Sequence, residues 1–380
     1  MKLYQIFVDR FSTDNAHKDA RLAFKTSKTW MGGNLKGVIS KLGYIKDMSF
    51  DAIWLTPIFS TSDYHGYSTT DFYSVDRHFG SNNTLKKLVD TAHSIGLKVI
   101  LDFVANHVSY KHPFFVSALK NGKSRYKKWF VFDGKDNYMS FLGFKGLPKL
   151  NTKNKEVIDY LTEAGLFWIN NFGIDGYRLD HAIGPSMEFW KVFTEACKKV
   201  DRNFAFLPEI WLSGIAPKYL NTLWFLEDET KKNALLELVN KNIGKAWDEI
   251  QSAKAEEFAM ELFSRLFKTP LDFSSNLAIR RLKFDMLEKR RKKGFIFADN
   301  HDMQRISWLI PDKTNSVVRE LGKAQNSIVY YGTEIGLSQK RDFSRLASFS
   351  DIECRRFMAW KKDNISKVKK FKYNFLGNQL

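Results

Sequence analysis

Short apolar runs alternate with longer amphipathic segments along most of the chain. The short runs are rich in Ile, Val, Leu and Phe, a composition typical of strands that are buried on both faces. They predict strands at Leu3–Val8, Ala52–Leu55, Val99–Val104, Gly176–Leu179, Phe204–Leu207, Phe295–Ala298 and Ser327–Tyr331. The longer segments repeat apolar residues at a helical spacing. They predict helices at Leu35–Met48, Thr84–Ile95, Lys155–Phe172 and Met187–Val200.

The repeated order of strand and helix decides the fold class. Such an alternation predicts parallel strands in one sheet with the helices outside it. Seven or eight repeats over 380 residues favour a closed barrel over an open sheet. We therefore predict an α/β protein with a (β/α)8 TIM barrel. No Gly-x-Gly-x-x-Gly motif follows the first strand, which argues against a dinucleotide-binding fold.

One segment interrupts the alternation. Residues 108–154 follow the third strand, and their Lys-, Phe-, Tyr-, Asn- and Gly-rich sequence shows no convincing helix. We predict a short inserted domain B here, on the catalytic face of the barrel. The remaining chain divides into a first part of the barrel at 1–107, the rest of the barrel at 155–362 and a basic tail at 363–380. No C-terminal β-sandwich is expected, because few residues follow Trp360.

Composition excludes several classes of protein. With 44% hydrophobic and 15% aromatic residues, the chain can bury a large core, so it is not a disordered protein. No run reaches the roughly 18 apolar residues that a membrane span needs. The N-terminal sequence lacks the apolar stretch of a secretion signal, which predicts a cytoplasmic protein. Two cysteines, Cys197 and Cys354, are too few for a disulfide framework or a cysteine-based metal site.

The chain carries a formal net charge of +18, and two short runs hold much of this excess. Residues 280–293 predict a helix with a solvated basic face, and residues 361–373 lie near the chain end. Neither run accompanies a nucleic-acid-binding motif or the interleaved aromatic residues of a stacking platform. We therefore expect solvated surface here, with no nucleic-acid or membrane partner.

Polar clusters lie at the C-terminal ends of four of the predicted strands. They are Asp102–His107, Arg178–Asp180, Glu209 and Asp299–Asp302. Any one of them could simply cap the following helix. Because the carboxyl ends of parallel barrel strands meet on one face, the four together predict a single pocket.

These residue types suit the cleavage of a glycosidic bond. One carboxylic acid protonates the leaving oxygen, and a second carboxylate attacks the sugar or activates water. A third nearby carboxylate helps to keep the acid protonated, because like charges raise one another's pKa. Arg178 lies two positions before Asp180 on the same strand face and can keep that carboxylate ionised. Neutral His107 and His301 can donate to or accept from sugar hydroxyls.

The four strand ends read DFVANH (102–107), GYRLDHA (176–182), FLPEIW (206–211) and FADNHD (297–302). These stretches resemble the four signature regions of the α-amylase family, glycoside hydrolase family 13. The stretch YHGYSTTDFYSVDRHFG (64–80) is similar to its substrate-stacking loop. The sequence LPKLN within residues 146–151 is most similar to the neopullulanase, cyclomaltodextrinase and maltogenic amylase group. The resemblance extends from near residue 3 to about residue 360.

The resemblance implies roles for individual residues. Asp180 would be the nucleophile, Glu209 the general acid and base, and Asp302 the residue that stabilises the transition state. Five further residues would contact the sugar or position the nucleophile, namely His65, Tyr67, His107, Arg178 and His301. The implied mechanism is a retaining double displacement, with the two principal carboxyl groups roughly 5–5.5 Å apart. Asp102 is expected to support Arg178.

The resemblance implies no cofactor for the chemistry itself and leaves a structural calcium ion open. Asn106 matches a calcium ligand of the family, but Gly184 stands where calcium-dependent members carry His. Asp14, Asn15 and Asp19 could form a separate calcium loop, although their loose spacing favours a capped polar turn.

The expected function is hydrolysis of α-1,4 bonds in maltodextrins, cyclodextrins or related α-glucans, with some α-1,6 activity. An alternative within the family is a 4-α-glucanotransferase, in which a sugar hydroxyl replaces water. An alternative of another class is a noncatalytic carbohydrate-binding scaffold, although all three catalytic carboxylates are present. The expected partner is an α-glucan oligosaccharide, and the sequence does not decide between a monomer and a homodimer.

Overall fold

Eight parallel strands form a closed barrel in the order β1–β12–β11–β10–β9–β8–β5–β2. This computed structural model describes residues 1–134, 136–210, 222–224, 271–273, 294–341, 351–360 and 364–377. The barrel strands are β1 (Lys2–Ile6), β2 (Ala52–Leu55), β5 (Lys98–Phe103), β8 (Gly176–Leu179), β9 (Ala205–Ile210), β10 (Leu271–Phe273), β11 (Gly294–Phe297) and β12 (Ser327–Tyr330). The predicted barrel is confirmed, and β10 is the one strand of this barrel that the apolar pattern did not predict.

The first and last strands close the barrel by pairing with each other. Leu3 of β1 lies opposite Ile328 of β12 on one side and Ala52 of β2 on the other. The N-terminal ammonium group donates to the Gln325 carbonyl (2.8 Å), immediately before β12. Both edges of β1 are therefore hydrogen-bonded within the barrel.

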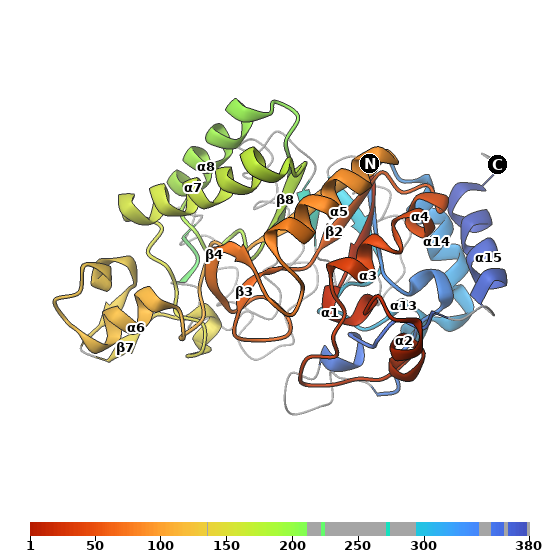
Figure 1. Cartoon of the computed structure of the whole chain (residues 1–380), viewed down its shortest axis with the longest axis horizontal. Helices are drawn as coiled ribbons and strands as arrows, with labels where there is room; N and C mark the ends of the chain where they lie inside the picture. The colour runs from red at the N-terminus through yellow and green to blue at the C-terminus, as the bar shows by residue number, and fades with distance from the viewer. Residues whose placement is uncertain are drawn as a thin grey trace, which may run out of the picture.

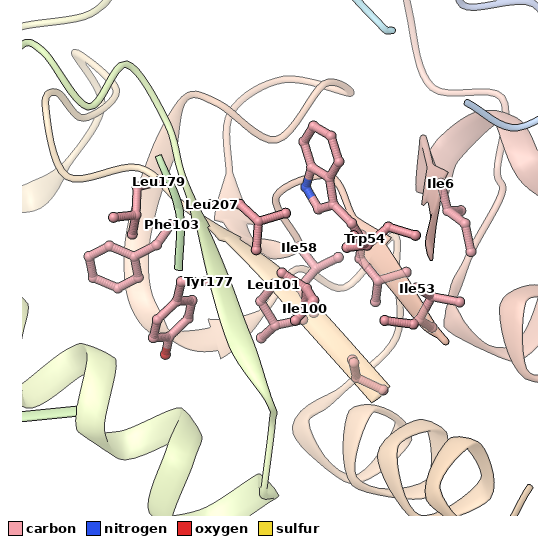
Figure 2. Packing of buried hydrophobic residues seen from close by; sticks show 14 of the residues in the cluster. Ile6, Ile53, Trp54, Ile58, Ile100, Leu101, Phe103, Tyr177, Leu179 and Leu207 are labelled. Atoms are coloured by element: carbon pink, nitrogen blue, oxygen red, sulfur yellow. The ribbon is translucent and has the colours of Figure 1, made fainter. Parts of the chain in front are cut away.

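Apolar side chains fill the space between the strands and the surrounding helices. Figure 2 shows Trp54 of β2, Leu101 of β5 and Tyr177 of β8 among the packed residues. Helices α5 (Asn82–Ser94), α7 (Lys155–Phe172) and α8 (Met187–Val200) turn their apolar sides toward this core. The last two helices match the predicted bounds at both ends.

Polar caps fix where the helices begin. The Asn154 side chain accepts from Glu156 N at the start of α7, and the Ser186 side chain accepts from Phe189 N at the start of α8. The helix predicted at 35–48 is two short helices, α3 (Leu35–Ile39) and α4 (Leu42–Asp47). The other short helices are α1 (Val8–Phe11), α2 (Ala16–Leu22), α13 (Ile306–Leu309), η4 (Pro311–Lys313), η5 (Thr333–Ile335) and η7 (Asp351–Glu353).

The inserted segment between β5 and α7 contains a helix, so the prediction of a segment without one is wrong. Helix α6 (Pro113–Lys120) begins at His112, whose Nδ1 accepts from Phe114 N, and it buries Phe115 and Ala118. The insert also holds η1 (Arg125–Trp129), η2 (Phe141–Gly143) and a hairpin of β6 (Phe132–Asp133) and β7 (Asn137–Tyr138). A second hairpin, of β3 (Phe59–Thr61) and β4 (Thr69–Val75), follows β2. Within the described part of the chain, these hairpins are the only sheets besides the barrel.

Residues near the C-terminal end form a packed helix, and the expectation of a basic tail at 363–380 is wrong for these residues. Helix α15 (Ile365–Leu376) packs beside α14 (Thr314–Lys323), at the end of the molecule opposite the insert (Figure 1). It buries Phe371 and Phe375 against Phe50. The other basic run, 280–293, lies outside the described residues. Of the helices described, none is long and apolar enough to cross a membrane.

Candidate active site

A single guanidinium group joins three carboxylates at the ends of the barrel strands. Arg178 Nη1 donates to Asp180 Oδ1 (2.9 Å) and to Asp102 Oδ1 (3.0 Å). Arg178 Nη2 lies 2.7 Å from Glu209 Oε1. All four side chains are buried. The nucleophile and the acid and base expected from the sequence therefore share one counterion.

The strand order explains why these residues meet. Strands β5, β8 and β9 are neighbours in the barrel, and Asp102 lies directly opposite Arg178 in their register. Asp180 follows β8 by one residue, and Glu209 lies near the end of β9. Parallel strands bring their carboxyl ends to the same edge, so residues far apart in the sequence become neighbours.

Asp102 supports Arg178, as expected. Its Oδ2 also accepts from Trp54 Nε1 (3.2 Å) and from the Tyr67 hydroxyl (3.1 Å). Both Asp102 oxygens therefore accept hydrogen bonds, and the carboxylate fixes the position of Arg178.

A second chain of hydrogen bonds joins Tyr67 to His301. Gln5 Nε2 donates to His301 Nδ1 (2.8 Å), which leaves the proton of a neutral ring on His301 Nε2. That nitrogen lies 2.6 Å from the Tyr67 hydroxyl and 3.1 Å from Asp302 Oδ2. The Tyr67 and His301 rings are nearly parallel, with their centroids 5.3 Å apart. Three of the predicted residues, Tyr67, His301 and Asp302, therefore lie together.

Asp302 has a partner that the sequence did not suggest. Arg355 Nη2 lies 2.7 Å from Asp302 Oδ1, and Arg355 Nε donates to the His301 carbonyl (2.8 Å). The Asp302 side chain is 49% exposed, whereas those of Asp180 and Glu209 are about 10% exposed. Of these three carboxylates, Asp302 is therefore the most exposed to solvent.

Burial and charge move the pKa values of the carboxyl groups in opposite directions. Burial raises the pKa of Asp180 to about 7 and that of Asp102 to about 7, although Arg178 acts to lower both. For Asp302 burial also acts to raise the pKa, but His301, Arg355 and Arg178 outweigh it and lower the pKa. These shifts favour an ionised Asp302 at neutral pH, whereas Asp180 and Asp102 keep their protons to a higher pH than a free carboxyl group does.

The histidines of the site are neutral. Burial lowers the pKa of His65 to about 4, of His107 to about 3 and of His301 to about 3. His65 lies beside Tyr67, whose backbone N–H donates to His65 Nδ1 (3.1 Å). A neutral imidazole has one donor and one acceptor nitrogen, which suits sugar hydroxyls.

The residues around Asn106 do not fit a divalent cation. Asn106 Oδ1 accepts from Lys149 Nζ (2.6 Å), which also donates to the Gly184 carbonyl (2.8 Å). Burial lowers the pKa of Lys149, and Lys153 adds to this effect. A metal ion bound to Asn106 at 2.3–2.6 Å would occupy the position of the Lys149 side chain. Calcium at Asn106, left open by the sequence, does not match this arrangement.

The other polar group considered for calcium is a capped turn. The Asn15 side chain accepts from Lys18 N, and Asp19 accepts from the Thr13 backbone and hydroxyl. Among the described residues, no group of three or more His, Cys, Asp or Glu side chains could hold a metal ion.

The comparisons with known proteins agree with this geometry. A family model described as the catalytic domain of α-amylase matches residues 5–373. The chain belongs to the α-amylase family. Its relatives in the family include cyclomaltodextrinases, maltogenic amylases and a neopullulanase, the group indicated by LPKLN. The resemblance derived from the sequence is thereby confirmed.

Two relatives illustrate the degree of similarity. α-Amylase 2 of Dictyoglomus thermophilum is 36% identical over 347 residues, which cover 90% of this chain and 56% of the relative. The intracellular maltogenic amylase of Bacillus subtilis is 31% identical over 375 residues, which cover 95% of this chain and 58% of the relative. The chain thus spans less than two thirds of the length of these family members.

Solved structures of the family superpose on 98% of the chain. An α-amylase from Geobacillus thermoleovorans, complexed with acarbose, is 30% identical with a TM-score of 0.70, covering 98% of this chain and 77% of that one. A cyclomaltodextrinase is 29% identical with a TM-score of 0.69, covering 98% of this chain and 62% of that one.

Proposed function

We propose that this chain is a retaining α-glycoside hydrolase that cleaves α-1,4-glucosidic bonds in maltodextrins, cyclodextrins or related α-glucans. The observation that carries the proposal is the shared contact of Asp180 and Glu209 with Arg178, at 2.9 Å and 2.7 Å. Because both carboxyl groups contact one guanidinium, they face the same small space, as a double displacement requires.

In the first step Glu209 donates a proton to the glycosidic oxygen while an Asp180 oxygen bonds to the anomeric carbon. The C–O bond breaks, and the leaving chain departs as an alcohol. In the second step the Glu209 carboxylate takes a proton from water, the water oxygen bonds to the anomeric carbon, and the bond to Asp180 breaks. Both residues return to their starting state.

The neighbouring residues act on the sugar and on the developing charge. Asp302 is ionised and half exposed, so it can grip hydroxyls of the distorted ring. His301, whose Nε2 lies 3.1 Å from Asp302 Oδ2, borders the same place. His107 would bind the sugar from the end of β5, and Tyr67 would stack on the ring. Relatives named cyclomaltodextrinase and intracellular maltogenic amylase support an α-glucan substrate and a cytoplasmic location.

Product release from maltoheptaose, β-cyclodextrin and pullulan tests the proposal. Wild type should cleave at least one of them, and Glu209→Gln should lose about 10²–10⁴-fold in kcat. The matched control is Glu188→Gln on the exposed side of α8, which should behave as wild type. NMR of the newly formed reducing end should show the α-anomer first, and a fluorinated substrate analogue should label Asp180.

Other outcomes would replace the proposal with a named alternative. A β-anomer as the first product would show an inverting reaction. Longer oligosaccharides formed with little glucose or maltose, when acceptor is abundant, would indicate a 4-α-glucanotransferase. Binding of all three glucans without cleavage would indicate a carbohydrate-binding scaffold.

A further inference from the structure

A buried lysine links three separate segments beside the site. The Lys149 side chain is fully buried, and its Nζ donates to Asn106 Oδ1 (2.6 Å) and to the Gly184 carbonyl (2.8 Å). The third side faces the Trp224 ring, whose centroid lies 4.3 Å from Nζ. Both oxygens can only accept, and the face of an aromatic ring attracts cations. Burial lowers the pKa of Lys149, but two oxygens that can only accept and a ring face that attracts cations oppose this effect and favour the ammonium form.

The cost of burying this charge calls for a reason. Among the described residues Lys149 has no carboxylate partner within ion-pair distance. Desolvated charges without a counterion are rare in proteins. Neutral oxygens around a buried cation are, however, the surroundings of a metal ion held by carbonyl and amide groups. The lysine therefore occupies a place built for a positive charge.

The backbone of the neighbouring loop is shaped around this contact. A Cβ atom on Gly184 would lie 2.1 Å from Asn106 Oδ1, so no larger residue fits there. Gly184 N donates to the His181 carbonyl (2.8 Å), and His181 has a φ of 41°. Residues 180–184 thus form a tight turn whose far end is held by Lys149.

That turn carries two groups of the site. It begins at Asp180, and His181 N donates to Glu209 Oε2 (2.8 Å). On the other side, Asn106 Nδ2 donates to His107 Nδ1 (3.2 Å), which fixes the orientation of that ring. The contacts of Lys149 therefore reach the sugar-binding His107 through Asn106, and they reach Asp180 and Glu209 through Gly184 and His181.

We propose that the Lys149 ammonium serves as a built-in substitute for a structural divalent cation and positions the turn that carries Asp180. Lys149 is a positioning residue and does not touch the substrate. The role in catalysis rests on the proposed function, whereas the exclusion of a metal ion does not. The enzyme should therefore work in the presence of a chelator.

The test compares variants of the full chain with and without calcium. Lys149→Met removes the charge at similar length, and kcat should fall about 10–100-fold, as for other residues that orient a site from outside, with KM changed less. Lys149→Asp places a carboxylate beside the Asn106 and Gly184 oxygens. Added Ca²⁺ should therefore bind to this variant, raise the Tm of the variant and restore its activity. Lys153→Met is the matched control, because this exposed neighbour approaches the same Trp224 ring (5.5 Å).

Calorimetric Ca²⁺ titration and Tm are measured beside activity, so the proposal is tested even if no glucan is cleaved. Stoichiometric Ca²⁺ binding by wild type, or its inactivation by EDTA, would overturn the proposal. So would a Lys149→Met variant with wild-type kcat and Tm. If Lys149→Met does not fold, the Lys149→Asp variant tests the proposal. If this variant fails to bind Ca²⁺, or binds it without a rise in Tm, the proposal that the ammonium group replaces a divalent cation is refuted.

Discussion

The Tyr67 hydroxyl offers a sharp test of how the site is held together. It lies 3.1 Å from Asp102 Oδ2 and 2.6 Å from His301 Nε2. Tyr67→Phe keeps the ring and removes both contacts. A hydrogen bond to a charged partner contributes about 1.5–3 kcal/mol. If this energy is fully expressed in the transition state, kcat/KM falls about 10–150-fold.

The assay is maltoheptaose hydrolysis, with Tm measured to confirm that each variant is folded. Tyr64→Phe is the matched control, since its hydroxyl lies 3.5 Å from Arg355 Nη1, and a contact this long contributes little, so kcat/KM should change less than about threefold. A folded Tyr67→Phe enzyme with the same rate as Tyr64→Phe would refute the reasoning.

Three further results are expected. Asp180 must be ionised to attack and burial raises its pKa to about 7, so kcat/KM should fall as the pH drops below this value. Asp102→Asn removes a negative charge that raises the pKa of Asp180, so this fall in kcat/KM should shift to lower pH. An unshifted pH profile would contradict the assignment of the fall to Asp180. Phe375→Ala should cost about 3–5 kcal/mol, which for 380 residues lowers Tm by about 4–6 °C. Exposed Tyr373→Ala should have little effect, and equal losses would show that α15 does not pack as described.

The strands and long helices could be predicted because each has a strong local signal. Ala52–Leu55 and Gly176–Leu179 are buried on both faces, so they form continuous apolar runs with sharp ends. The α7 helix has a polar cap and a long amphipathic repeat. Strand β10 is only Leu271–Phe273, with Asp272 between its two apolar residues, and so short a run has no distinctive pattern.

The two missed helices show how composition can hide periodicity. In α15, Val368, Phe371 and Phe375 share one face at helical spacing, but four lysines between Lys367 and Lys372 suggested a solvated tail. Packing of that apolar face against Phe50 stabilises the helix, and the lysine-rich composition gave no indication of this contact. Helix α6 has eight residues, too few for the repeat to stand out.

The candidate site could be predicted as a set of strand-end carboxylates, but not its supporting contacts. Asp102, Asp180 and Glu209 lie at the ends of recognisable apolar runs, so the barrel itself brings them together. Lys149 and Arg355 act through partners 43 and 53 residues away, Asn106 and Asp302. No local spacing encodes such contacts, because they depend on how the insert and the last loops pack on the barrel.

The pairing of β1 with β12 also affects the nascent chain during translation. Leu3 can pair with Ala52 early, but its other partner, Ile328, is 325 positions later in the sequence. At 5–20 residues per second, the ribosome needs roughly 16–65 s to deliver it. During this interval one edge of β1 stays open to pairing with other chains. We therefore expect that slowing elongation late in the message increases aggregation, and that a chaperone that binds extended segments suppresses it.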